Sequence, residues 1–209
     1  MKKIISSFTS AAVAGMCVSI GATAFLSVEN KMTGALLFCL GLFVVCTLGY
    51  NLFTGKVCYC FDTDFRYVLN LGVIWLGNLF GAWCSASLLR MTRIAETVSA
   101  KAAALCEMKL GDSLWSVFIL AIFCDVLIYI GVEEYRNNPH QVGKYMALIF
   151  AVVVFTMCGF EHCVANMYYV SMAGMWSGRA LLFILVNTLG NSVGGLLVPV
   201  LKKFVIEKR

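Results

Sequence analysis

Charged side chains are scarce in this sequence: Asp, Glu, Lys and Arg make up 13% of the 209 residues, against about 25% in a soluble domain. Proline is nearly absent, with two residues, whereas glycine is frequent, with 18, a combination typical of membrane helices. Hydrophobic residues make up 61% of the chain, and its mean hydropathy is +0.87. This composition excludes a soluble protein and leaves no room for a separate soluble domain. We therefore expect a polytopic protein of the lipid bilayer.

Histidine is also scarce, with two residues, and the ten cysteines form no CxxC pair. Most of the cysteines lie inside apolar runs, where a buried thiol behaves as a small hydrophobic side chain. We therefore predict no metal site, no disulfide framework and no cofactor. The pI of about 8.7 is attributed to Lys and Arg that flank the apolar runs, so it predicts no nucleic-acid partner.

Apolar runs bounded by charged residues predict six membrane-spanning helices. They cover residues 4–28, 33–60, 67–92, 113–132, 144–172 and 179–201. The first run follows a basic start, as in a signal peptide, but it is long enough to cross a bilayer at about 20 residues per crossing. We expect it to be an uncleaved helix. The segment "RMTRIAETVSAK" (90–101) predicts a short surface helix between the two halves.

Six crossings place both termini on the same side of the membrane. Ten of the 16 Lys and Arg residues fall on that side, and six fall on the other. Because loops in the cytoplasm carry the excess of positive charge, this distribution predicts cytoplasmic termini in the cell inner (cytoplasmic) membrane.

Two of the six apolar runs are interrupted by polar groups. The second contains "GYNLFTGK" (49–56) and the fifth contains "GFEHCVAN" (159–166). Non-helical backbone at membrane depth is tolerated only where it is buried in protein or lines a cavity. Two interrupted helices at corresponding places therefore predict a transport site.

The interruptions occupy matching positions in the two halves. Gly49 precedes Gly159 by 110 residues, and "LGNLFG" (76–81) precedes "LGNSVG" (189–194) by 113. Chance recurrence of LGNxxG in a glycine-rich chain is the competing explanation, but it does not account for the two breaks also being in register.

The pattern predicts a single domain of residues 1–209 built from two three-helix repeats, at about 4–92 and 113–201. Because three is an odd number, the second repeat enters the membrane from the opposite side, and the repeats are inverted. Amide side chains can bond the backbone groups that a helix break frees. The residues expected to do so are Asn51, Asn78 and Asn191.

Between Tyr145 and Gly178, the only acidic, basic or imidazole side chains are Glu161 and His162. Ionisable groups inside a membrane are functional or structural necessities. On a helix, neighbouring residues point about 100° apart. We therefore expect Glu161 to face away from the pore that His162 faces, and to bind N–H groups freed at the first break.

The segments "LFTGK" (52–56), "FEHCVANM" (160–167) and "GNSVGG" (190–195), with six spans and broken second and fifth helices, resemble the formate/nitrite transporter family over essentially the whole chain. The resemblance implies an all-α, aquaporin-like fold assembled as a homopentamer with one pore per protomer. It also implies passage of small monovalent anions of weak acids, namely formate, nitrite or hydrosulfide.

The resemblance also assigns site residues. It implies a central pore pair of Thr54 and His162, and a pore-mouth lysine at Lys109. The apolar constrictions on either side of the central site match Phe38, Leu42, Leu52, Phe53 and Phe155. One position departs from the family, because Asp125 stands where the family has an Asn. An acid near an anion path is acceptable only if it is neutral, paired or turned away from that path.

The chemistry of weak acids explains what such a site needs. A buried, unpaired charge is very costly, but an anion that takes up a proton crosses as a neutral molecule. Lys109 supplies a positive potential in this scheme, and Thr54 binds the substrate. His162 either exchanges the proton, or stays neutral and donates a hydrogen bond while bulk water supplies the proton. A third interpretation makes His162 a packed core residue bonded to Glu161 or to backbone.

Two other functional classes compete with an anion channel. A neutral-solute channel of the same architecture predicts paired Asn-Pro-Ala motifs at the breaks, and neither break has one. An intramembrane zinc hydrolase needs three ligands and a motif such as HExxH, but only one histidine lies in the spans. The chain is therefore predicted not to be an enzyme.

Overall fold

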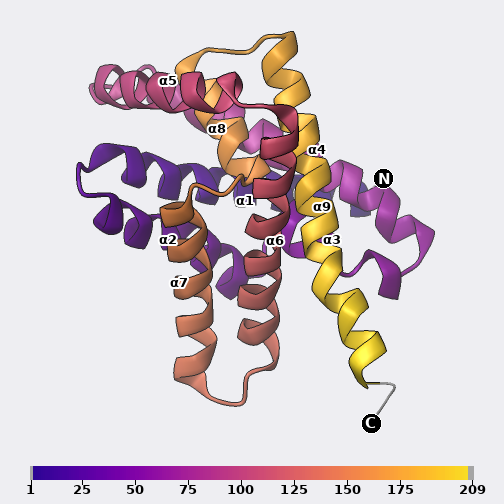
Figure 1. Cartoon of the computed structure of the whole chain (residues 1–209). Helices are drawn as coiled ribbons and strands as arrows, with labels where there is room; N and C mark the ends of the chain where they lie inside the picture. Colours follow the sequence, from indigo (N-terminus) through magenta and orange to yellow (C-terminus); the bar gives the residue numbers. More distant parts are fainter. Residues whose placement is uncertain (1, 207–209) are drawn as a thin grey trace.

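The computed structural model describes residues 2–206, and this part of the chain folds into helices joined by short turns (Figure 1). Lys208 and Arg209, which were counted with the charges near the termini, lie outside the described residues. The helices are α1 (Lys2–Ser27), α2 (Lys31–Leu48), α3 (Phe53–Val57), the 3-10 helix η1 (Cys60–Asp62), α4 (Phe65–Leu89), α5 (Ala95–Gly111), α6 (Leu114–Asn137), α7 (Gln141–Cys158), α8 (Cys163–Ala173) and α9 (Gly178–Ile206).

Within residues 2–206, six helices are long and apolar enough to cross a membrane. They are α1, α2, α4, α6, α7 and α9. This finding confirms the prediction of an all-α protein with six helices that are capable of spanning a membrane.

Three predicted segments were wrong by five residues or more. The sixth span, predicted to end at residue 201, continues in α9 to Ile206. The fourth span continues past residue 132 to Asn137, because charge at its end does not stop backbone hydrogen bonding and Asn138 N still donates to Glu134 O at 2.9 Å. The surface helix expected at 90–101 is α5, which begins at Ala95 and ends at Gly111.

The two halves pack in the same pattern. In the first half α1 packs on α2 and α4, and in the second half α6 packs on α7 and α9. Figure 1 shows α6 and α7 side by side, joined by a tight turn at one end. The α1–α4 and α6–α9 contacts are close: a Cβ on Gly81 would overlap the carbonyl oxygen of Ala12, and one on Gly194 would overlap that of Ile122. Small residues at such crossings let membrane helices approach each other.

Helices α2 and α7 both end at a glycine in the left-handed region. Gly49 has φ 73° and Gly159 has φ 70°, values that side chains with a Cβ rarely adopt. The next amide closes each end, with Tyr50 N donating to Val45 O at 3.0 Å and Phe160 N donating to Phe155 O at 2.9 Å. Residues 49–52 and 159–162 are therefore not helical, and α3 and α8 begin directly after them.

Candidate functional site

The first non-helical segment is held by one amide side chain. Asn78, fully buried on α4, donates from Nδ2 to Ala11 O at 2.8 Å and to Asn51 O at 3.0 Å. Its Oδ1 accepts from Phe53 N, the first amide of α3, at 2.8 Å. Asn78 thus satisfies two backbone groups at the break, Asn51 O and Phe53 N, and ties them to α1 through Ala11 O.

Asn191 makes the equivalent bonds in the second half. It is fully buried on α9, and its Nδ2 donates to Ala121 O at 2.8 Å and to Glu161 O at 2.8 Å. Its Oδ1 accepts from Cys163 N, the first amide of α8, at 2.9 Å. Each of the three backbone partners lies 110 residues after its counterpart in the first half. Both breaks are thus held in the same geometry.

The two breaks bring Thr54 and His162 together. Thr54 lies in the first turn of α3, His162 is the N-cap of α8, and Thr54 Oγ1 lies 3.0 Å from His162 Nε2. Thr54 is fully buried, and His162 is 4% exposed. The central pair expected from the family resemblance is therefore a hydrogen-bonded pair in this fold.

The cap contact fixes the tautomer of His162. Its Nδ1 accepts from Ala165 N at 3.1 Å, so in the neutral ring the proton is on Nε2 and is donated to Thr54 Oγ1. A second proton on Nδ1 would face the Ala165 N–H and remove the cap. The neutral ring leaves the hydroxyl hydrogen of Thr54 available to another acceptor.

An apolar cavity of about 10 Å³ lies next to this pair. The residues lining this central cavity are Val18, Phe38, Leu42, Leu52, Ile128, Val152, Phe155 and His162. A single water needs roughly 10–15 Å³, and it also needs polar partners, of which His162 is the only one in this wall. The centre of the protein is therefore dry in this conformation.

A wider cavity of about 110 Å³ lies beyond Phe155, and we call it the Lys109 vestibule. It shares Phe38, Phe155 and His162 with the central cavity, and it is also lined by Lys109 and by Lys31. The Phe155 ring stacks on His162, with centroids 5.7 Å apart, and meets Phe38 edge-on at 5.8 Å. These rings separate the vestibule from the central cavity.

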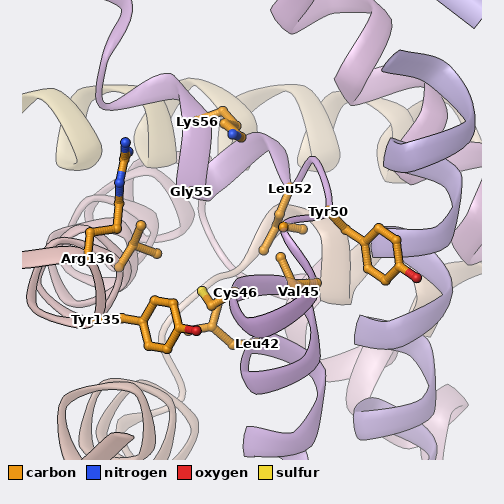
Figure 2. Close-up of a pocket in the computed structure, with 11 residues that line it drawn as sticks. Leu42, Val45, Cys46, Tyr50, Leu52, Gly55, Lys56, Tyr135 and Arg136 are labelled. Atoms are coloured by element: carbon orange, nitrogen blue, oxygen red, sulfur yellow. The ribbon is translucent and has the colours of Figure 1, made fainter. Parts of the chain in front are cut away.

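A third cavity, of about 250 Å³, lies on the other side, and we call it the Arg136 vestibule. It shares Leu42 and Leu52 with the central cavity. Figure 2 shows Leu42 and Tyr135 at one side of this cavity, with the nitrogen-bearing ends of Lys56 and Arg136 at another. The three cavities thus follow one another along the molecule, separated by apolar side chains and by the His162 ring.

Four of the five expected constriction residues line the central cavity. Phe53 is buried, but it is not among the residues that line any of these three cavities. Phe53 begins α3, and its backbone amide donates to Asn78 Oδ1. The expectation that Phe53 contributes to a constriction does not match this geometry.

Glu161 is placed differently from the expectation that it binds freed N–H groups. Its Oε2 accepts from Lys109 Nζ at 2.6 Å and from Asn166 Nδ2 at 2.6 Å. A buried carboxylate requires a counter-charge, and Lys109 on α5 supplies it. The backbone groups at the break are bonded by Asn191 instead. The positive potential expected from Lys109 is therefore offset by Glu161.

Asp125, the position that departs from the family pattern, is fully buried on α6. Neither of its carboxyl oxygens has a hydrogen-bond partner among residues 2–206. Its Oδ2 occupies the space where a Cβ on Gly195 would lie, and it lines none of the three cavities. The acid is thus turned away from the series of cavities.

Comparison with known proteins adds to this geometry. The model of the protein family described as formate/nitrite transporter matches residues 1–205 of this chain. Formate channel FocA of Haemophilus influenzae is 25% identical over 193 residues, which cover 82% of this chain and 67% of FocA. Formate channel BtFdhC of Bacillus thuringiensis is 30% identical over 186 residues, which cover 81% of this chain and 70% of that protein. These relatives are channels and not enzymes.

Solved structures share the fold. A pentameric formate channel with formate bound superposes with a TM-score of 0.82 at 24% identity, covering 100% of this chain and 99% of the other. An FNT family ion channel superposes with a TM-score of 0.80 at 21% identity, covering 97% of this chain and 90% of the other. The whole arrangement of helices is thus found in solved ion channels.

Proposed function

The chain belongs to the formate/nitrite transporter family, and from this premise we propose that it is a membrane channel for small monovalent anions of weak acids, namely formate, nitrite or hydrosulfide. The observation that carries the proposal is the 3.0 Å contact between Thr54 Oγ1 and His162 Nε2, next to a dry cavity between two wider vestibules. The names of the relatives support formate as the first anion to test.

The dry centre determines the form in which the solute crosses. An anion cannot enter an apolar cavity without a partner for its charge, whereas its conjugate acid is neutral. We propose that the anion takes up a proton from water in a vestibule and passes the Phe155 ring as the neutral acid. The hydroxyl hydrogen of Thr54 then binds an oxygen or sulfur of the acid while His162 Nε2–H holds the hydroxyl in place. His162 stays neutral in this scheme, which its Ala165 cap supports.

The proposal includes the architecture and the assembly. The equivalent bonds of Asn78 and Asn191 support two inverted repeats within one channel domain. The pentameric channel of the same fold supports a homopentamer with one pathway per protomer. The excess of Lys and Arg near the termini supports cytoplasmic termini in the inner membrane, so the Arg136 vestibule faces the cytoplasm.

Flux into proteoliposomes tests this function. Formate, nitrite and hydrosulfide are offered separately between about pH 5 and pH 8, the range that includes titration of an unperturbed imidazole. Water and glycerol permeation are measured in the same vesicles. We expect at least one of the three anions to cross much faster than in protein-free vesicles, with a rate that rises as the pH falls.

A substitution ties the flux to the central pair. Thr54→Val replaces the hydroxyl with a methyl group and keeps the branched shape of the side chain. It is expected to slow the flux strongly. If none of the three anions crosses while water or glycerol does, the protein is a neutral-solute channel and the proposal is wrong. Unchanged flux in Thr54→Val would show that the pathway does not use this pair.

A further inference from the structure

The Arg136 vestibule contains two cationic side chains and no acid. Lys56 comes from α3 and Arg136 from α6, and the other lining residues are all uncharged. In Figure 2 the ends of both side chains lie at the same rim, with Gly55 between them. Neither cation forms an ion pair within the described part of the chain, where the recorded salt bridges involve other lysines.

The Lys109 vestibule differs in this respect. Both of its lysines are already engaged, because Lys109 Nζ donates to Glu161 Oε2 at 2.6 Å and Lys31 Nζ donates to Met157 O at 3.0 Å. An anion arriving there meets lysines that have other partners. Glu161 neutralises Lys109, whereas the Met157 carbonyl leaves the charge of Lys31 uncompensated. The two vestibules are therefore electrostatically unequal: among the described residues, two cations without an ion pair line the Arg136 vestibule and one lines the Lys109 vestibule.

Arg136 is held in position by an aromatic ring and not by a carboxylate. Its guanidinium carbon lies 4.7 Å from the centroid of the Tyr59 ring, a cation–π geometry that leaves the charge of the guanidinium uncancelled. The neighbouring acid is Glu133, which accepts from Tyr59 OH at 3.0 Å and lies 4.0 Å from Lys202. Glu133 thus forms no ion pair with Arg136, although its charge lies near enough to attract the guanidinium.

Lys56 is also positioned by its surroundings. Its carbonyl oxygen accepts from Tyr67 OH at 2.9 Å and from Tyr59 N at 3.2 Å, which fixes the end of α3. The side chain is half-buried beside an apolar wall, where a charge has a stronger field than in open water. Two cations at one rim of such a cavity concentrate anions there.

We propose that Lys56 and Arg136 form an anion-binding site that captures small carboxylates and other weak-acid anions at this entrance, before they lose their charge to protonation. The proposal rests on the proposed function for the identity of the anion. The shared residues Leu42 and Leu52 connect the site directly to the central cavity, so a captured anion lies one apolar layer away from it. The site serves the side of the membrane on which the termini lie.

Cys46 offers a local probe, because it lines the same vestibule. The full-length protein is prepared with Cys60, Cys84 and Cys158 replaced by serine, since these are the other cysteines that are not buried. Cys46 is then labelled with two methanethiosulfonate reagents of similar size, one carrying a sulfonate and the other a trimethylammonium group. Mass spectrometry of the Cys46 peptide gives the two rates, and Cys46→Ser shows the background.

We expect the anionic reagent to react faster than the cationic one, by about tenfold or more, the lower end of electrostatic steering in a charged cleft. Sodium formate should slow the anionic reagent more than sodium chloride of equal ionic strength does. The Lys56→Gln/Arg136→Gln variant should lose both effects. Lys144→Gln is the matched control, because it removes a charge near the start of α7 from outside this vestibule and should leave the ratio unchanged.

The outcomes separate this site from the transport function. If the double variant keeps the rate ratio of the parent, the site is overturned even when formate crosses the bilayer. If the ratio depends on Lys56 and Arg136 while no anion crosses, the binding site stands and the proposed function fails. An equal loss of the ratio in Lys144→Gln would also overturn the site, since the preference would then come from general surface charge.

Discussion

Lys109 Nζ lies 2.6 Å from Glu161 Oε2 in a site where the two side chains are only 9% and 4% exposed. The contact links α5 to the segment before α8, and Asn166 Nδ2 adds a second bond to the same carboxylate oxygen at 2.6 Å. Both members of the pair are withdrawn from water, so each is the other's main compensation for lost hydration. The break in the second half thus depends on a helix that lies outside the six membrane-spanning segments.

Glu161→Gln is expected to destabilise the protein. The substitution leaves the Lys109 ammonium buried without a counter-charge, and breaking a buried pair in this way costs about 3–5 kcal/mol. Thermal unfolding of the purified protein in detergent measures the effect. Lys109→Met/Glu161→Gln should recover part of the loss, because no charge is then left unpaired. A double variant no more stable than Glu161→Gln would contradict this account.

Thr54→Val and Thr54→Ser should separate the hydroxyl group from the shape of the side chain. Valine leaves His162 Nε2–H without its acceptor, and a buried donor without a partner costs about 1–3 kcal/mol. We expect formate flux, measured by stopped-flow light scattering, to fall at least about tenfold with valine, which corresponds to about 1.4 kcal/mol on the barrier. Serine should retain most of the flux. Similar rates for both variants would exclude a role for the hydroxyl.

His162→Asn tests whether the imidazole titrates during transport. Asparagine is a good N-cap, so the bond to Ala165 N is preserved while the contact with Thr54 is lost. Flux should fall, but its relative increase from about pH 8 to about pH 5 should match that of the unsubstituted protein, because a ring that stays neutral contributes no titration. A pH dependence that flattens in the variant would show that His162 exchanges the proton.

Asn78→Ala and Asn191→Ala should have similar effects on stability. Each removes the partner of two carbonyl oxygens and one N–H, at about 1–3 kcal/mol for each group that stays buried and unbonded. Chemical denaturation monitored by far-UV circular dichroism measures both losses. A large effect at one position and none at the other would argue against equivalent roles in the two halves.

Local patterns in the sequence were sufficient for the six apolar helices, though not for all of their ends, and for the glycines at which α2 and α7 end. Gly49 and Gly159 interrupt apolar runs, and glycine is the residue that ends a helix with positive φ. The recurring LGNxxG segments indicated Asn78 and Asn191, because an amide in an apolar helix needs backbone partners.

Side-chain partners distant in sequence could not be predicted in this way. Lys109 and Glu161 are separated by 52 residues, and their contact depends on α5 continuing to Gly111. Lys56 and Arg136 come together only because α3 ends beside α6, and neither residue belongs to a recurring motif. Such contacts are decided by tertiary packing, which periodicity does not report.

Gly195 and Asp125 should be coupled energetically. A Cβ on Gly195 would overlap Asp125 Oδ2 and lie 3.3 Å from Val57 Cγ1, so Gly195→Ala is expected to cost about 1–3 kcal/mol, the usual range for overpacking. Because the obstructing atom belongs to a side chain, Asp125→Ala should remove most of that cost.

Gly194→Ala is the contrasting case, since its Cβ would overlap the backbone oxygen of Ile122, which no side-chain substitution removes. A double-mutant cycle compares the unfolding free energies of the parent protein, the Gly195→Ala variant, the Asp125→Ala variant and the variant with both substitutions. It gives a coupling energy, expected at about 0.5–3 kcal/mol for residues in contact. Repeating the cycle with Gly194 should give a coupling near zero. Equal coupling at both glycines would mean that Asp125 acts on the whole α6–α9 interface and not through its contact with Gly195.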